Sequence, residues 1–251
     1  MIFFKSKEEI LRMRESGRIV ADVLKHLRGL IKPGISTLEL ETAAVNRMKE
    51  IAPDAVAAFK GYMGFPAALC VSLNSEVVHG IPSAKRFVKD GDIVSVDFGV
   101  EYHGYYGDAA ISVIAGEGSQ EAKRLVRVTE ESLYEGIKAA RVGNKLFDVS
   151  HAIQEYVESY GYSVVREYVG HGIGRSMHES PQVPNFGETG TGLILTDGMT
   201  IAIEPMISAG GYDVSVLNDG WTAVTSDGSL SAHFEHSIAI TSQGTIILTE
   251  L

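Results

Sequence analysis

Four acidic side chains lie in segments that otherwise have the composition of buried β-strands, and they constrain the fold more than any other feature of the chain. They are Asp97, Asp108, Glu204 and Glu235. Placing a lone carboxylate in an apolar sheet is costly unless it is paired or binds a metal ion. Each acid alone is weak support for a site, but four together predict a sheet that gathers oxygen ligands around a shared positive charge.

The first two acids lie on the two arms of a predicted hairpin. If Tyr102 and His103 form its tip, residues whose numbers add up to 205 face each other, and Asp97 lies opposite Asp108 with Cβ atoms about 4.5–5.5 Å apart. Like charges at that distance destabilise a sheet, and no Lys or Arg occurs between residues 90 and 122. A divalent cation is the simplest counter-charge. The alternative interpretation is a solvent-exposed acidic edge, since most acids lie outside.

Two histidines, His171 and His178, occur seven residues apart in the glycine-rich stretch 170–179. We expect this stretch to be too flexible for an ordinary strand interior. With His171 as the only nitrogen ligand beside four carboxylates, the predicted site is rich in oxygen and free of thiolate. Structural zinc usually recruits Cys and more His, so this set favours Mn²⁺, Fe²⁺ or Co²⁺. Four negative charges favour two divalent ions over one.

The order of predicted elements repeats along the chain. Two helices are predicted to begin at capping boxes, Ser6 with Glu9 and Ser36 with Glu39. β-rich segments follow at 69–73, 93–101 and 105–114, helical periodicity returns over 119–140 and 146–160, and strands follow again. This duplication predicts an α+β fold of two similar halves, each laying a helix pair on a shared, mainly antiparallel sheet. No linker-like tract separates the halves, which predicts a single domain over residues 1–251.

Composition excludes several classes of function. The formal net charge is −10 and no basic cluster occurs, which argues against a nucleic-acid-binding surface. The single cysteine, Cys70, cannot close an intrachain disulfide, which is typical of a reducing compartment. No apolar run is long enough for a signal peptide or a membrane span. We therefore expect a soluble, cytoplasmic protein.

Five separated motifs occur in order along the chain. They are Val78-His79-Gly80-Ile81-Pro82, Asp97-Phe98-Gly99 with Gly107-Asp108, Gly170-His171-Gly172-Ile173-Gly174 with His178-Glu179, Ile203-Glu204-Pro205, and Phe234-Glu235-His236. With these motifs the chain resembles type I methionine aminopeptidases of the short bacterial kind, over essentially its whole length. The resemblance implies the pita-bread fold, an α+β fold with pseudo-twofold halves, in agreement with the duplication described above.

The resemblance also implies site residues, position by position. The metal ligands carry over to Asp97, Asp108, His171, Glu204 and Glu235, and the catalytic residues to His79, His178 and Glu204. The substrate pocket carries over to Phe59, Tyr62, Phe65, Cys70, His79, Met177, His178 and Trp221. Many bacterial members are expected to have Cys, Tyr and Phe at positions 59, 65 and 177, where this chain has Phe, Phe and Met. The pocket therefore remains apolar, but its detailed shape is expected to differ. Alternation places His233 on the face of Glu235, in a position to support the ligands.

The implied activity is removal of the N-terminal methionine from nascent proteins and peptides, with a preference for a small second residue. Two divalent ions, Co²⁺, Mn²⁺ or Fe²⁺ with Zn²⁺ or Ni²⁺ as further options, would activate a hydroxide. Glu204 would take the proton, His178 would stabilise the oxyanion, and His79 would hold or protonate the scissile nitrogen. The implied partners are nascent polypeptide N-termini, with transient ribosome contact, and the implied state is a monomer.

Two other functions compete with this one. An Xaa-Pro aminopeptidase or dipeptidase of the same fold would share the metal ligands, but such chains usually carry a sizeable domain before the first histidine motif, and here only about 70 residues precede His79. A non-catalytic peptide-binding module of this fold would typically have lost metal ligands, and all five are present. Release of methionine from a peptide, with and without chelator, separates these hypotheses.

Overall fold

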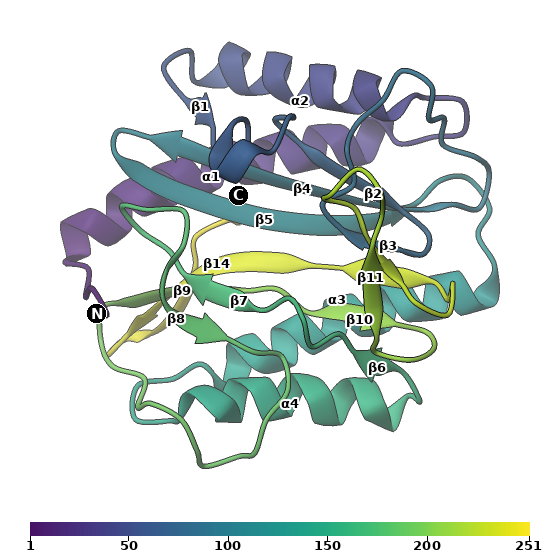
Figure 1. Ribbon diagram of the computed structural model, residues 1–251. Coiled ribbons are helices and arrows are strands. Elements are labelled where there is room, and N and C mark those ends of the chain that lie inside the picture. Colours follow the sequence, from purple (N-terminus) through teal and green to yellow (C-terminus); the bar gives the residue numbers. More distant parts are fainter.

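The computed structural model describes residues 1–251 and contains four α-helices (Figure 1). They are α1 (Lys7–Leu30), α2 (Thr37–Ile51), α3 (Gln120–Ala139) and α4 (Leu146–Ser159), accompanied by one 3₁₀ turn, η1 (Tyr62–Gly64). All four predicted helices are present. Both predicted capping boxes form, since Ser6 accepts from the Glu9 amide and Ser36 from the Glu39 amide. None of the helices combines the length and the apolar character needed to cross a membrane.

The strands are mostly short and all of their pairings are antiparallel. In chain order they are β1 (Val56–Ala57), β2 (Cys70–Leu73), β3 (Glu76–Val78), β4 (Ile93–Tyr102), β5 (Tyr105–Ile114), β6 (Ser163–Val164), β7 (Gly170–Gly172), β8 (Glu179–Val183), β9 (Met199–Ile203), β10 (Met206–Ser208), β11 (Val214–Val216), β12 (Ala223–Thr225), β13 (Ser231–His233), β14 (Glu235–Thr241) and β15 (Gly244–Ile247). The predicted antiparallel sheet is therefore confirmed.

Nine strands form one large sheet in the order β1-β4-β5-β14-β9-β7-β8, with β2 on β4 and β15 on β14. Two three-stranded sheets, β13-β10-β6 and β11-β12-β3, complete the strand layer. Figure 1 shows α1 and α2 together beside β4 and β5, and α3 with α4 together on the opposite side of the strand layer. The predicted arrangement of two helix pairs around a shared sheet is confirmed.

Each helix pair has its own hydrophobic core. One core of 20 buried residues joins α1 and α2 to β2 and β4 through side chains such as Leu27, Leu40 and Val96. The other, of 23 buried residues, joins α3 and α4 to β9 and β14. In the first half α1 lies directly on β5, because a Cβ at Gly107 would come within 2.8 Å of the Gly17 backbone nitrogen. The helices therefore pack on one face of the large sheet. The opposite face is available for the site.

The β4–β5 hairpin has a different register from the predicted one. Tyr102 pairs with Tyr105, so the two-residue turn is His103–Gly104, and both have positive φ, 52° and 82°. Positive φ at both central positions is the requirement of a type I′ turn, which glycine satisfies easily. The prediction that Asp97 faces Asp108 directly is therefore wrong. The pairing moves by two residues, which keeps both side chains on the same face of the sheet.

Candidate active site

The sheet aligns two of the acids in one row across three neighbouring strands. Asp97 on β4 pairs with Ala110 on β5, and Ala110 pairs with Glu235 on β14. Directly paired residues point to the same face, so the two carboxylates extend on one side of the sheet with only a methyl group between them. The small side chain of Ala110 leaves space above the sheet for whatever the carboxylates hold.

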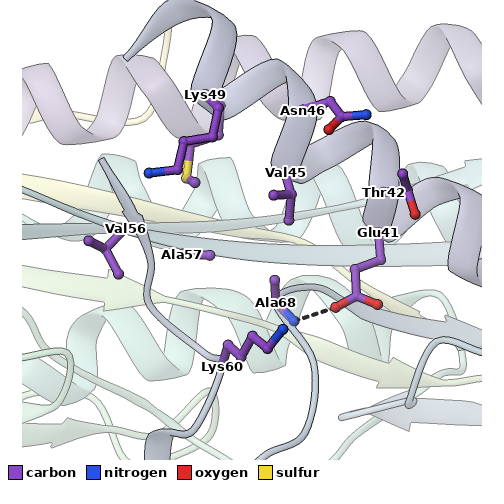
Figure 2. Close-up of a pocket in the computed structure, with 10 residues that line it drawn as sticks. Glu41, Thr42, Val45, Asn46, Lys49, Val56, Ala57, Lys60 and Ala68 are labelled. Atoms are coloured by element: carbon purple, nitrogen blue, oxygen red, sulfur yellow. Dashed lines mark hydrogen bonds between the residues drawn. The ribbon is translucent and has the colours of Figure 1, made fainter. Parts of the chain in front are cut away.

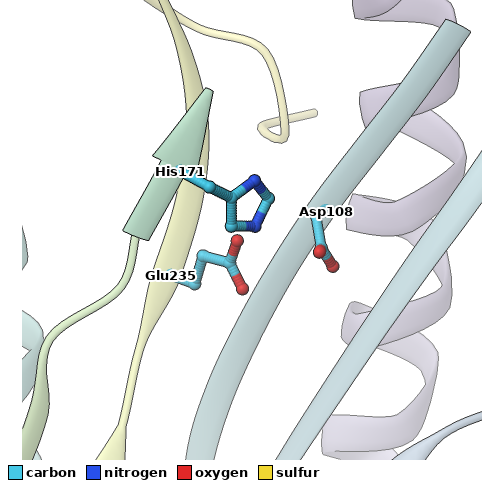
Figure 3. Close-up of side chains that lie close together, drawn as sticks. All are labelled: Asp108, His171 and Glu235. Carbon is cyan, nitrogen blue, oxygen red and sulfur yellow. The ribbon is translucent and has the colours of Figure 1, made fainter. Parts of the chain in front are cut away.

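Asp108 reaches the same space from the adjacent row, where it pairs with Gly99. Figure 3 shows Asp108, His171 and Glu235 pointing toward one another from three different strands. One potential ligand atom from each lies within 4.8 Å of the others, and all three residues are buried. The structure therefore brings together a carboxylate pair and an imidazole that are far apart in the sequence.

His171 lies in strand β7, so the expectation that the glycine-rich stretch is too flexible for a strand is wrong for 170–172, whereas 173–178 contain no strand. The flanking glycines serve close packing instead, because a Cβ at Gly170 would meet the Ala202 carbonyl oxygen at 2.3 Å. The Nδ1 atom of His171 lies 2.9 Å from the Gly172 carbonyl oxygen, and a carbonyl can only accept a hydrogen bond. The proton therefore sits on Nδ1, and Nε2 is free to act as a ligand.

The apolar residues around Glu204 predicted that it lies within a strand. This prediction is wrong, because Glu204 lies between two strands. Strand β9 ends at Ile203, and Pro205, which has no N–H for a strand ladder, separates Glu204 from β10. The break allows the Glu204 carboxylate to approach His171, with Oε1 3.6 Å from Nε2. His233 is buried on the other side, with its Nε2 atom 4.0 Å from Glu204 Oε2. The prediction that strand alternation places His233 on the face of Glu235 is wrong, because His233 ends β13 and Glu235 begins β14, which belongs to another sheet. The acid in contact with His233 is Glu204.

The electrostatics of the acid cluster match a site built for cations. Burial raises the pKa of Asp97 to about 7. Burial, together with the negative charges of the neighbouring acids, raises the pKa of Asp108, Glu204 and Glu235 well above the usual range. Burial also lowers the pKa of His171 to about 3, which keeps the imidazole neutral as a metal ligand must be.

Three carboxylate oxygens in this cluster are buried and accept no hydrogen bond. They are Asp97 Oδ1, Asp108 Oδ1 and Glu235 Oε1. Buried polar atoms without a partner are uncommon in folded proteins and require an explanation. Hard divalent cations bind to exactly this kind of oxygen donor, so these residues fit a metal centre.

An apolar wall closes one end of the acid cluster. Phe59, Phe65, Cys70 and Met177 are buried together, with Trp221 packed against them, and the rings of Phe65 and Trp221 meet edge to face at 5.2 Å. Gly99 makes this possible, because a Cβ there would lie 2.6 Å from Met177 Cε and 2.8 Å from Phe59 Cε1. The side chains at positions 59 and 177 therefore fill the space that Gly99 leaves.

The acids and the apolar wall line one cavity of about 240 Å³. Its lining includes all five residues named as metal ligands, His79 and His178, and the pocket residues except Met177, which packs directly behind the wall. The structure thus brings every residue singled out from the sequence into one place. A charged end and an apolar end within one small cavity are suited to hold a short polar chain end with an apolar side chain.

Two histidines stand at the rim of this cavity in held positions. His178 Nδ1 lies 2.8 Å from the Tyr62 hydroxyl, and its ring packs against His171 with centroids 4.1 Å apart. His79 adopts a left-handed backbone conformation, with φ 61°, and packs its ring edge to face against Tyr168. Such strained conformations in residues other than glycine concentrate at functional sites. Burial lowers the pKa of His79 to about 4 and lowers the pKa of His178, so both rings are neutral near pH 7.

Sequence reasoning missed one residue of this cavity, Met63. It lines the mouth with 83% of its surface exposed. The signal was present but weak: Gly61 and Gly64 flank it, and both have positive φ, as does Met63 itself. Periodicity could not find Met63, because a tight turn that presents an apolar side chain to solvent has no buried face.

A larger cavity, of about 520 Å³, lies away from this site between α2 and the edge strand β1 (Figure 2). Among the residues that line it, the Glu41 carboxylate accepts a hydrogen bond from the Ala68 amide at 2.6 Å. It contains no cluster of acids and histidines, so its lining offers no comparable chemistry.

Comparison with known proteins agrees with this geometry. The sequence profile of metallopeptidase family M24 matches residues 11–242. The chain belongs to this family. It is 51% identical to methionine aminopeptidase 1 of Bacillus subtilis, with full coverage of both chains. The crystal structure of methionine aminopeptidase from Thermotoga maritima superposes with a TM-score of 0.98 at 52% identity, again over the whole of both chains.

A more distant solved structure shares the fold alone. The Xaa-Pro dipeptidase of Bacillus anthracis superposes with a TM-score of 0.78 at 24% identity, and the alignment covers 99% of this chain but 62% of the dipeptidase. The pita-bread fold and the resemblance to methionine aminopeptidases are therefore confirmed. The length difference agrees with the expectation that proline-specific relatives carry additional sequence.

Proposed function

We propose that residues 1–251 form one catalytic unit, a methionine aminopeptidase that hydrolyses the peptide bond after an N-terminal methionine. The observation that carries this proposal is the single cavity in which an apolar wall adjoins a cluster of acids and histidines. The methionine side chain would lie against Phe65, Cys70 and Trp221, with the scissile bond above the acids. The relatives named methionine aminopeptidase, about half identical over the whole chain, support the same activity.

The residues that would hold the metal ions are those whose oxygens lack partners, together with the neutral imidazole beside them. They are Asp97, Asp108, His171, Glu204 and Glu235. Four carboxylates balance two divalent ions, and oxygen-rich donors favour Mn²⁺, Fe²⁺ or Co²⁺, with Zn²⁺ or Ni²⁺ as further options. Divalent ions held there would lower the pKa of water toward neutrality and would so supply a nucleophile near pH 7.

Three side chains of the protein would carry out proton transfer, oxyanion stabilisation and substrate positioning. Glu204 takes the proton released by the attacking water and returns it to the departing amine. The Tyr62 hydroxyl lies 2.8 Å from His178 Nδ1 and can donate to it. In that tautomer the His178 proton lies on Nε2, from which it would donate to the developing oxyanion. His79, neutral and held by its neighbours, fixes the scissile nitrogen from the rim.

The same geometry suggests the partners and the surroundings of the enzyme. A cavity of about 240 Å³ has room for one residue at its apolar end, which favours chain ends and a small second residue near the crowded rim. Nascent polypeptide N-termini are the natural source of such ends, and we propose a cytoplasmic monomer acting on them. With a net charge of −10, contact with the ribosome would be local and not spread over a basic surface.

A peptide assay tests the proposal. The protein is freed of metal with chelator, reloaded with Mn²⁺, Fe²⁺ or Co²⁺, and incubated with Met-Ala-Ser, Met-Leu-Ser, Lys-Ala-Ser and Ala-Pro-Ser. Release of methionine from Met-Ala-Ser, faster than from Met-Leu-Ser and abolished by chelator, is the expected result. Preferential cleavage of Ala-Pro-Ser would indicate a proline-specific enzyme, and no cleavage with any metal would indicate a binding module.

A further inference from the structure

The loop 174–178 connects β7 to β8 and carries two residues of the site, Met177 and His178. The loop has no regular secondary structure, and two of its backbone amides donate hydrogen bonds to one carboxylate, that of Glu179. Glu179 Oε1 accepts hydrogen bonds from the amides of Arg175, at 2.8 Å, and Ser176, at 3.2 Å. The conformation of the loop therefore depends on where this carboxylate is held.

A lysine from the beginning of the chain holds it. Lys5 Nζ lies 2.5 Å from Glu179 Oε2, and the two side chains are only 4% and 6% exposed. Buried pairs of opposite charge are rare, because both ions lose their hydration. Removing one partner would leave the other charge unpaired in the interior, so the pair is sensitive to change from either side.

The position of Lys5 is itself fixed by the backbone around it. Its ammonium also donates to the Phe3 carbonyl oxygen at 3.0 Å, and its amide donates to the Gly198 carbonyl oxygen at 2.7 Å. Figure 1 shows the start of the chain beside β8 and β9. The loop rests directly on this lysine, because a Cβ at Gly174 would come within 2.3 Å of Lys5 Cε.

We propose that Lys5 and Glu179 are positioning residues that lock the loop so that His178 reaches the scissile carbonyl and Met177 closes the pocket. The proposal rests on the function proposed above. Neither side chain lines the substrate cavity, so both act through the loop. The N-terminal segment would then be a working part of the site, although it lies more than 160 residues before the loop in the sequence.

A second ion pair links the same two segments and supplies a matched control. Arg175 Nη2 lies 3.0 Å from Glu9 Oε1, and these side chains are 70% and 26% exposed. Solvent-exposed pairs contribute little to stability, since water screens them. Arg175→Met should therefore leave methionine release within about twofold of the wild type.

The test compares three variants with that control, each measured for kcat and KM on Met-Ala-Ser, melting temperature, and deuterium exchange of the amides at 175 and 176. Lys5→Met should lower the melting temperature and lower kcat by about tenfold or more, since a displacement of about 1 Å at a catalytic group can cost about 100-fold. In Lys5→Met with Glu179→Met the buried charges are gone, so the melting temperature should recover. Its kcat should stay low and its two amides should exchange faster, because the acceptor of their hydrogen bonds is missing.

The third variant, Lys5→Met with Glu179→Gln, keeps an oxygen that can accept both amide hydrogen bonds, and it should regain part of the lost kcat. A wild-type kcat in the double methionine variant would show that the pair is merely structural and would overturn the proposal. Should the wild type release no methionine, the proposed function fails separately. Amide exchange still tests the anchoring in that case, and unchanged protection in the double methionine variant would refute it.

Discussion

The site has two parts of different construction. The acidic floor, Asp97, Asp108 and Glu235, belongs to strands β4, β5 and β14, which pair with one another in the large sheet. The pocket rim, Tyr62, Met63, His79 and His178, belongs to turns and short connections, with left-handed backbone at Met63 and His79. The floor is held by the backbone ladders of paired strands. The rim is held by isolated turn hydrogen bonds, such as that from the Tyr62 amide to the Phe59 carbonyl oxygen, and by single side-chain contacts, such as that between Tyr62 and His178.

This difference in construction follows from the task of each part: the floor holds metal ligands, and the rim contacts the substrate. Metal ligands need positions fixed to within a fraction of an ångström, and a paired sheet supplies them without depending on any one side chain. Residues that meet a substrate must approach from several directions, which loops do and a flat sheet face does not. Damage to the floor should therefore abolish the chemistry, and damage to the rim should weaken it in steps.

The largest effect is expected at the floor. Glu235→Gln preserves the shape of the side chain but removes one negative charge and one metal-binding oxygen, so metal content and methionine release should both fall to background. Elemental analysis and a peptide assay measure the two. Glu188→Gln, at an exposed position away from the site, is the control and should change neither. Full activity of Glu235→Gln would remove this residue from the site.

Next in size is the response of the metal-free protein to pH. Above about pH 6.5 the raised pKa values mean that the folded acids still hold protons that the unfolded chain has released. The free energy of unfolding should then fall as the pH rises from 6.5 to 8, because the folded state binds more protons than the unfolded chain over this range.

Buried histidines determine the pH below which this decline in the free energy of unfolding is no longer expected. The pKa of His79, His171, His233 and His236 is lowered to about 3 or 4, so below pH 6.5 their protonation in the unfolded chain opposes the trend. Denaturant unfolding at pH 6.5 and 8, in chelator and in Mn²⁺, measures the effect. Metal should abolish the decline, because bound cations replace the protons. An equal decline with and without metal would contradict a cation site at the floor.

At the rim, His178→Ala should leave metal content unchanged and lower kcat by roughly 100-fold or more, the scale of losing one oxyanion donor. The matched comparison is His26→Ala, a histidine on α1 with no part in the site. Loss of metal from His178→Ala would place this residue with the floor. A wild-type kcat would transfer the oxyanion role to another group.

The sequence predicted the floor better than the details of how it is built. Acids within apolar strands can be recognised because burial of charge is costly wherever the strand lies, and the helix caps at Ser6 and Ser36 depend only on local hydrogen bonds. The hairpin register was missed although the sequence held a signal for it: a two-residue turn needs positive φ at its central positions, which Gly104 adopts far more easily than Tyr102. The short strand around His171 was missed because its glycines are required by the neighbouring backbones, which are distant in sequence.

The smallest effect is expected from the hydroxyl that orients His178. Tyr62→Phe keeps the ring in the pocket wall but removes the hydrogen bond to Nδ1, which lies 2.8 Å away. The neutral imidazole could then carry its proton on either nitrogen, and only the Nε2 form can donate to the oxyanion. We expect kcat to fall by about tenfold, on the scale of one neutral hydrogen bond, with KM little changed because the apolar contacts remain. Tyr106→Phe removes a hydroxyl from a residue packed against the same apolar cluster and serves as the control. A change in KM alone would mean that Tyr62 acts only as part of the methionine pocket, and that the rim holds His178 in its productive form by the loop alone.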